Sequence, residues 1–107
     1  MKVQVIKKHP GEGVFPTFEK GTKVTMKEVC THFVHWYACE IAGYQTYVPL
    51  SFACDGVLER DYNPTELVQE VGDIVKVQEI VYAWLLARNE AGMIGWIPAE
   101  VVVSKVL

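Results

Sequence analysis

The stretch GMIGWIPAEVV, residues 92–102, decides the fold of this 107-residue chain. It contains two glycines three positions apart, Gly92 and Gly95, followed by Trp96, Ile97 and Pro98. Glycine adopts the positive φ angles of tight turns, and proline cannot donate a hydrogen bond to a β-ladder. The stretch therefore predicts a strand that leaves a tight turn and ends at Pro98.

The rest of the chain has the pattern of short strands. Apolar residues alternate with polar ones or form short blocks between glycines, prolines and polar turns, and helical periodicity is almost absent. The loop His9 to Gly13 is rich in chain breakers. The predicted strands are Val3 to Ile6, Lys23 to Val29, Phe33 to Ile41, Thr46 to Val48, Val57 to Tyr62, Ile74 to Ile80, Trp84 to Ala87 and Gly95 to Ile97, and the C-terminal end has room for one more. The predicted fold class is all-β.

The second half of the chain repeats the first. Residues 19–24 correspond to residues 70–75 at a separation of 51, residues 35–38 to 83–86 at 48, and residues 47–49 to 96–98 at 49. We interpret the changes of separation as differences in loop length. The sequence therefore predicts two copies of one unit of about 50 residues, with the domains 1–55 and 56–107.

The second copy resembles the Src homology 3 domain. Residues 58–62, LERDY, are similar to the opening motif ALYDY of that family, and Glu66-Leu67 with Gly72 to Val77 resembles Glu-Leu-Ser-Phe-x-x-Gly-Asp-x-Ile-x-Val. Trp84 stands at the first of the paired tryptophans, and residues 95–98 are similar to the closing Gly-x-x-Pro. In the first copy, Phe18 to Thr22 resembles Phe-Lys-Lys-Gly-Asp, and Trp36, Tyr47 and Pro49 extend the likeness.

The resemblance implies two tandem SH3-like barrels, each of five short strands, packed together. The interval between Pro49 and Tyr62 is too short for a last strand, a flexible linker and a new first strand. We therefore expect Cys54 to Asp61 to pass directly from one barrel to the other, so that the two form a rigid pair.

The same resemblance implies a non-catalytic module that binds a protein or peptide segment. In the family, exposed aromatic residues form a groove for a polyproline II peptide, and nearby acids select a basic residue in the ligand. Arg60 and Val101 stand where the family has groove tyrosines, so a proline-rich ligand is only one of the candidates. The implied peptide-binding residues are Tyr62, Trp84, Trp96 and Pro98 with the acids Asp61 and Glu66, and the implied second site is Trp36, Tyr47, Pro49 and Phe52.

Three alternatives stay open. The aromatic residues can instead be buried, within a barrel or between the two, because each ring buries about 150–250 Å². A cell-wall or glycan-binding module is the alternative drawn from bacterial relatives of this fold. A structural subunit that uses its aromatic residues for self-association is a third function, and the oligomeric state is open.

Composition and charge argue against other classes. The formal net charge of −3 disfavours nucleic acid as a partner, and no apolar run reaches the roughly 20 residues of a membrane span. The N-terminus lacks the apolar core of a signal peptide, so we expect a cytoplasmic protein.

The cysteine and histidine residues are not expected to form a metal or catalytic site. Three cysteines without tight spacing fit reduced thiols. Cys30, His32, His35 and Cys39 offer zinc-binding atoms, but the run between them is strand-like rather than a tight knuckle. No motif marks an activated Cys-His pair, so we expect no enzyme activity, metal or cofactor.

Overall fold

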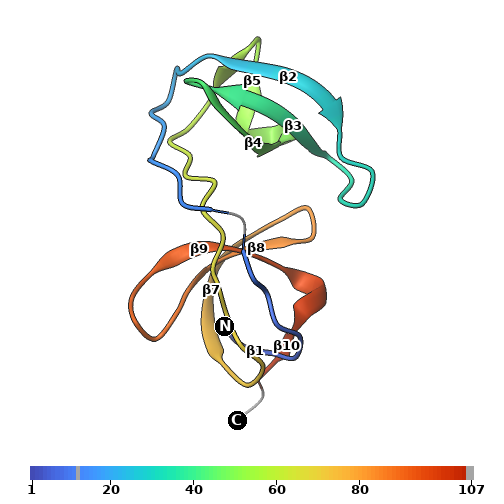
Figure 1. Ribbon diagram of the computed structural model, residues 1–107, viewed down its shortest axis with the longest axis vertical. Coiled ribbons are helices and arrows are strands. Elements are labelled where there is room, and N and C mark those ends of the chain that lie inside the picture. Colours follow the sequence, from blue (N-terminus) through green and yellow to red (C-terminus); the bar gives the residue numbers. More distant parts are fainter. Residues whose placement is uncertain (12, 106–107) are drawn as a thin grey trace. The chain divides into compact units, whose positions relative to one another are not determined.

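The computed structural model describes residues 1–11 and 13–105, and this part of the chain is all-β (Figure 1). Ten strands, β1 to β10, are joined by turns and by two short 3-10 helices, η1 and η2. Glu12, within the predicted loop His9 to Gly13, lies outside the described residues. The fold class agrees with the expectation from the sequence.

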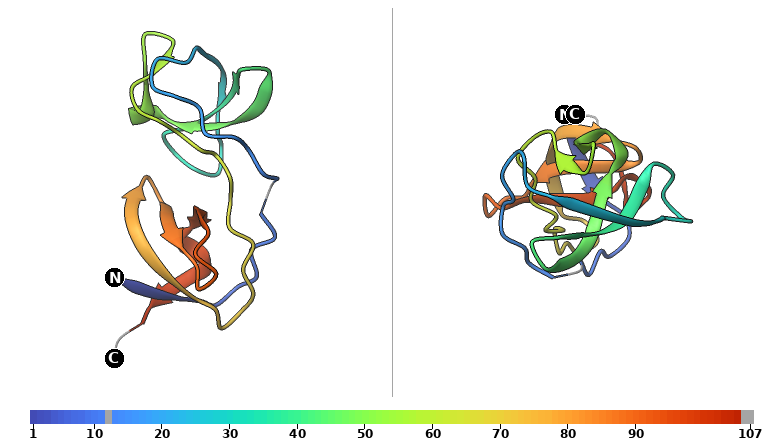
Figure 2. Two further views of the ribbon diagram at one scale, coloured as in Figure 1. Left: turned by 90° about the vertical axis from the view of Figure 1, so that its left-hand side faces the viewer. Right: turned by 90° about the horizontal axis from the view of Figure 1, so that it is seen from above.

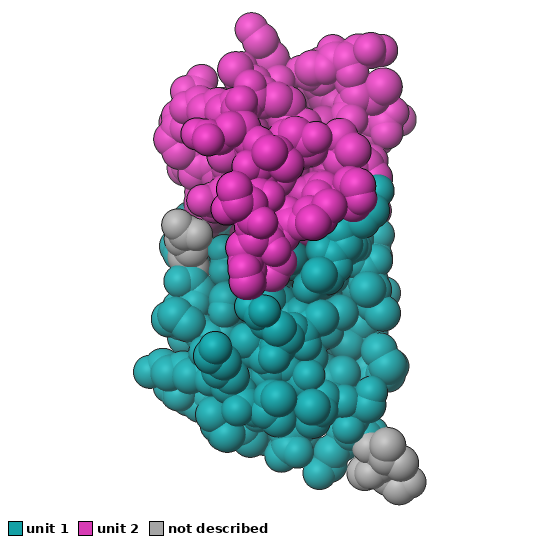
Figure 3. All heavy atoms as spheres, turned by 90° about the vertical axis from the view of Figure 1, so that its right-hand side faces the viewer, with its two compact units in different colours: residues 1–14, 65–107 teal, residues 15–64 magenta. Residues whose placement is uncertain are grey.

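The chain forms two compact units that are not consecutive halves (Figure 3). Unit 1 consists of residues 1–14 and 65–107, and unit 2 consists of residues 15–64. This division differs from the expected one after residue 55. The chain passes between the units near residues 14 and 64, not along Cys54 to Asp61, because Asp55 and Gly56 close a hairpin that lies entirely within unit 2.

Unit 1 contains a five-stranded antiparallel sheet with the order β10-β1-β7-β8-β9. Its strands are β1 (Lys2–Val5), β7 (Ile74–Val81), β8 (Trp84–Arg88), β9 (Ile94–Pro98) and β10 (Val102–Ser104), with η2 (Ala99–Val101) before the last. The N-terminal strand β1 thus pairs with two strands from the far end of the sequence. The register of β7 shifts between Val77 and Glu79, and a bulge of this kind bends a strand, as the curvature of β7 shows (Figure 2).

The core of unit 1 lies on the inner face of this sheet. Inward residues alternate along the strands, as the period of two requires, so Leu85 and Ala87 are buried in β8 while Leu86 between them is only half-buried. The core residues are Val3, Val5, Leu67, Val75, Leu85, Ala87, Ile97 and Val101. Full burial of one such Val, Leu or Ile side chain contributes about 1.5–3 kcal/mol.

Residues 65–67 lie beside β9 at close range, with a parallel bridge between Glu66 and Trp96. Leu67 donates its N–H to the carbonyl of Trp96 at 2.9 Å, and Trp96 donates to the carbonyl of Thr65 at 3.0 Å. A Cβ atom on Gly95 would lie 2.9 Å from the Thr65 carbonyl oxygen and 3.1 Å from the Leu67 nitrogen. Glycine at position 95 therefore makes room for this pairing.

Unit 2 contains a three-stranded antiparallel sheet and a two-stranded hairpin. The sheet has the order β2 (Val24–Val29), β3 (Trp36–Ile41) and β4 (Tyr44–Pro49), and η1 (Leu50–Phe52) leads to the hairpin of β5 (Ala53–Cys54) and β6 (Val57–Leu58). The buried apolar residues of this unit are Phe18, Val24, Trp36, Cys39, Ile41, Val48, Phe52, Leu58 and Tyr62.

Two predicted strands are shorter than expected. The strand predicted from Phe33 begins at Trp36, because His35 adopts a φ of 70°, which ends the extended backbone before it. The strand predicted from Val57 to Tyr62 ends at Leu58, and Tyr62 keeps only an isolated bridge to Phe18.

Candidate functional site

A tryptophan and a proline face each other at the end of two neighbouring strands of unit 1. Trp84 is the first residue of β8 and pairs across the sheet with Pro98, the last residue of β9. The chain reverses just before Trp84, where Tyr82 and Ala83 have φ angles of 44° and 70°. Pro98 is buried, whereas Trp84 is half-buried, so part of the indole remains accessible.

His9 and Glu66 complete this site. The imidazole of His9 meets the indole of Trp84 edge-on, with ring centroids 5.9 Å apart and planes at 74°. His9 Nε2 lies 2.9 Å from Glu66 Oε1, and the two side chains are only 12% and 16% exposed. The backbone of His9 is fixed by reciprocal hydrogen bonds with Gln69, both 3.0 Å long. We call Trp84, Pro98, His9 and Glu66 the tryptophan site.

The sequence interpretation missed His9 because its partners lie far along the chain. Glu66 is 57 residues away in sequence, and no local motif links the two. One signal was present in the sequence. An aromatic side chain lies just before a proline in both copies, as His9 before Pro10 and as Tyr62 before Asn63 and Pro64. Aligning these two segments would have placed His9 at the position of Tyr62.

Trp96, which was predicted to contact the peptide, is buried. Its side chain is 3% exposed, and its backbone is bonded on both sides to residues 65 and 67. This ring packs within the protein, the alternative left open by the sequence, so Trp84 is the tryptophan of unit 1 that remains partly accessible.

Tyr62 and Asp61 belong to unit 2, not to the unit that holds Trp84. Tyr62 is 3% exposed, donates its hydroxyl to the Tyr47 carbonyl at 2.5 Å, and meets the Phe52 ring edge-on at 5.5 Å. Asp61 is exposed and accepts the backbone N–H of Lys20 at 2.8 Å. The six residues of the predicted peptide site are therefore divided between the two units.

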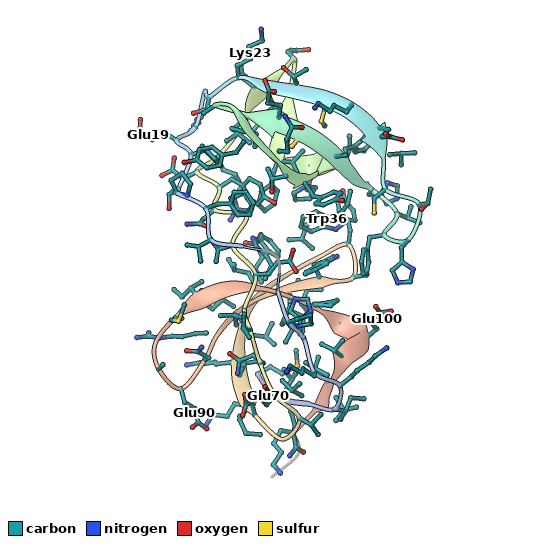
Figure 4. All side chains as sticks on the ribbon, viewed as in Figure 1. Glu19, Lys23, Trp36, Glu70, Glu90 and Glu100 are labelled. Carbon is teal, nitrogen blue, oxygen red and sulfur yellow. The ribbon has the colours of Figure 1, made fainter. Side chains whose placement is uncertain are left out.

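The residues of the predicted second site all lie in unit 2. Trp36, which Figure 4 labels, pairs across the sheet with Pro49, as Trp84 does with Pro98. Unlike Trp84, Trp36 is only 5% exposed. Phe52 is also buried, beneath the Arg60 guanidinium 4.2 Å from its ring centroid. Only Tyr47, at 42% exposed, presents a large apolar surface.

A further aromatic group in unit 2 was not predicted. Tyr44 is 43% exposed and is contacted edge-on by Phe18 at 5.6 Å and by Phe15 at 6.0 Å. Its signal in the sequence is its place directly after the turn residue Gly43, where a strand must begin.

Two of the three thiols, Cys39 and Cys54, are not in environments that activate them. Burial raises the pKa of the Cys39 thiol to about 11, opposed in part by the positive charge of Lys27. The carboxylates of Asp55, first, and Glu59 raise the pKa of the exposed Cys54 thiol. Reactive cysteines have lowered pKa values, because the thiolate is the nucleophile. Neither group has the character of a catalytic cysteine.

The described part of the chain has neither a metal-binding group of side chains nor a membrane-spanning helix. Within residues 1–11 and 13–105, no three His, Cys, Asp or Glu side chains are grouped so that they could hold a metal ion. Among the same residues, no helix has both the length and the apolar character needed to cross a bilayer. The acidic side chains of Glu90 and Glu100 are exposed on unit 1 (Figure 4).

Comparison of the chain with protein-family models, with curated proteins and with solved structures gives no match.

Proposed function

We propose that each unit is a small SH3-like barrel and that the protein is a non-catalytic interaction module, which binds a protein or peptide segment at the tryptophan site of unit 1. The observation that carries the proposal is the half-buried indole of Trp84, which is supported by Pro98 and by the edge of His9. A five-stranded antiparallel sheet with a 3-10 turn before its last strand supports the fold part of the proposal.

The ligand that fits this surface is an extended segment with apolar residues and at least one basic residue. Tryptophan offers an apolar face and one N–H donor, so it can pack on a proline or aliphatic side chain and bind a peptide carbonyl. A polyproline II segment loses little entropy when it binds. The Glu66 carboxylate has two oxygens with about four acceptor positions, and one oxygen is bonded to His9. Capacity is left for a lysine or arginine of the ligand.

We propose a structural role for unit 2, because its tryptophan, Trp36, is not accessible to a ligand. The Trp36, Phe52 and Tyr62 rings are each at most 5% exposed, so a ligand cannot reach their faces without displacing packed groups. Tyr47 and Tyr44 are exposed and offer a weaker surface. We assign the principal contact to unit 1 for this reason.

The test is a titration with a library of fluorescein-labelled peptides of the type Pro-x-x-Pro, each with one arginine. Trp84→Ala is compared with Met93→Ala, which removes an exposed apolar side chain elsewhere in unit 1. Loss of a central aromatic contact costs about 2 kcal/mol or more, a roughly thirtyfold rise in Kd. We expect this rise for Trp84→Ala alone, with both variants folded by circular dichroism.

Two results would contradict the proposal. One is that no peptide of the library binds, and the other is that Trp84→Ala leaves the Kd of the bound peptides unchanged. A parallel titration with a soluble peptidoglycan fragment separates the glycan alternative, because binding of that fragment with no peptide binding would replace the peptide by a sugar ligand.

A further inference from the structure

The first strand of the chain is held by a set of backbone hydrogen bonds in unit 1. Val5 donates its N–H to the Asp73 carbonyl and accepts from the Gly72 N–H, both at 2.8 Å. On its other side β1 pairs with β10, where Gln4 lies opposite Val103. The strand β1 therefore lies between β7 and β10.

The short strand β6 is held in the same way in unit 2. Leu58 donates its N–H to the Thr22 carbonyl at 2.9 Å and accepts from the Gly21 N–H at 2.8 Å. On its other side β6 pairs with β5, where Val57 lies opposite Cys54. The strand β6 therefore lies between β5 and the segment that leads into β2.

The correspondence extends beyond these two strands. Further equivalent pairs are Ile6 N–H to Val101 O and Glu59 N–H to Phe52 O, each 2.8 Å, and the reciprocal bonds His9 with Gln69 and Tyr62 with Phe18. Leu58 follows Val5 by 53 positions, and Gly72 follows Gly21 by 51. The separation of 51 is one of those of the repeat found in the sequence, and the separation of 53 is two positions longer. In each unit, the first strand comes from one copy and the other strands come from the other copy.

We propose that residues 1–55 and 56–107 are two copies of one unit that have exchanged their first strands. Strand β1 of the first copy completes the sheet of β7 to β10, and strand β6 of the second copy completes the strands β2 to β5. The chain is thus the covalently joined form of a strand-exchanged pair, in which each unit accepts a strand from the other copy.

The cause of the exchange is the turn at Asp55 and Gly56. Their φ angles are 52° and 77°, the positive values of a two-residue hairpin turn. Such a turn joins only neighbouring antiparallel strands, so β6 must pair with β5 of the first copy and cannot reach β7 or β10 of its own. The place beside β7 and β10 then remains for β1, which the longer segment 6–14 can deliver.

The first test uses two matched core positions. Val5 and Leu58 are each 1% exposed and have equivalent hydrogen bonds. Along the chain, Val5 comes before β2 and Leu58 comes before β7, but each packs in the unit formed by the strands of the other copy. Amide hydrogen exchange followed by NMR is expected to be at least tenfold faster in β7 and β8 for Val5→Ala, and in β2 and β3 for Leu58→Ala. The opposite pattern would overturn the exchange. If either variant fails to fold, Val5→Thr and Leu58→Val repeat the comparison with smaller changes.

The second test uses cysteine pairs and a longer turn. Both variants carry Cys30→Ser. In the first, Gln4→Cys and Val103→Cys can form a disulfide only in the exchanged form, and Cys54→Ser removes the competing thiol. In the second, Gln4→Cys and the native Cys54 can form a disulfide only in the unexchanged form. With the natural turn we expect a disulfide, formed by oxidised glutathione, only in the first variant. With twelve Gly and Ser residues inserted between Asp55 and Gly56, we expect the second variant to form one as well. A disulfide to Cys54 with the natural turn would overturn the exchange, and none after the insertion would overturn the role of the turn.

Discussion

Units 1 and 2 differ in how they provide hydrogen-bond partners for the backbone at one strand edge. In unit 1, the backbone of Trp96 in β9 forms two hydrogen bonds with residues 65 and 67. Counting back 51 positions from Leu67, the residue of unit 2 is Pro16, which has no N–H to donate. There the carbonyl of Tyr47 in β4 accepts the Tyr62 hydroxyl instead. The strand carbonyl is therefore hydrogen-bonded by a side chain in unit 2 and by a backbone N–H in unit 1.

The units also differ at their tryptophan and proline pairs. Trp84 in unit 1 is half-buried beside a small polar ring, His9, whereas Trp36 in unit 2 is 5% exposed. Unit 2 has Tyr62, 53 positions after His9, and this larger ring packs on Phe52. One architecture therefore presents its tryptophan in one unit and encloses it in the other, which is why we assign binding to unit 1 and support to unit 2.

The largest expected effect follows from the pairing of residues 65–67 with β9. Leu67→Ala removes a side chain that is 1% exposed in the core of unit 1, and such changes cost about 2–5 kcal/mol. Pro16→Ala, at the matching place in unit 2, changes an exposed side chain, and we expect about 0.5 kcal/mol or less. Urea unfolding followed by circular dichroism measures both. Equal losses would show that the two segments do the same work.

A smaller loss is expected when Gly95 is replaced by alanine. The new Cβ would lie 2.9 Å from the Thr65 carbonyl oxygen, so residues 65–67 must shift, at a cost of about 1–3 kcal/mol. Thr46, 49 positions earlier in β4, already carries a side chain, so Thr46→Ala tests a place without this close pairing and is expected to keep the backbone bonds of β4. The Trp96 amide, which is bonded to the Thr65 carbonyl, reports this shift directly in an NMR spectrum. An unchanged Trp96 amide signal in Gly95→Ala would contradict the close pairing.

The sequence predicted those features that depend on local pattern. The strands near Gly72, Gly95 and Pro98 were found because glycine and proline mark strand ends through their own backbone limits. The pairing of β1 with β7 and β10 was not found, because a strand of alternating valines fits either sheet equally well and backbone hydrogen bonds leave no mark on residue type. The backbone hydrogen bonds of Trp96 with residues 65 and 67 were not found for a related reason, since they join positions about 30 apart.

Tyr62→Phe removes the hydroxyl that replaces the backbone bond in unit 2. The Tyr47 carbonyl then loses this donor, and we expect a loss of about 1 kcal/mol in the free energy of unfolding. The ring itself remains packed against Phe52, so the effect should be confined to β4 and to the segment around Tyr62. Hydrogen exchange of the amides in β4 checks this, with His9→Phe as the corresponding change in unit 1. A loss of protection in β9 but not in β4 would contradict the comparison.

The smallest expected effect is a pH-dependent change in stability at Cys39 of β3, where the corresponding residue of β8 is an alanine. Cys39 lies 48 positions before Ala87, and both are buried. Burial raises the pKa of Cys39 to about 11 in the folded state, whereas an unfolded thiol has a pKa of about 8.5. Because the folded state favours the neutral thiol, the stabilisation is present below the unfolded pKa and is lost as the pH rises toward 11, by on the order of 1 kcal/mol at pH 9.5.

Cys39→Ala gives unit 2 the residue of unit 1 and removes this titration. We therefore expect the variant to lose less stability between pH 8 and pH 9.5 than the natural chain, measured by urea unfolding at each pH. The other titrating groups are common to both proteins, so the difference between the two pH profiles isolates the thiol. Parallel profiles would show that the Cys39 environment admits the thiolate and is more open to water than the corresponding place at Ala87.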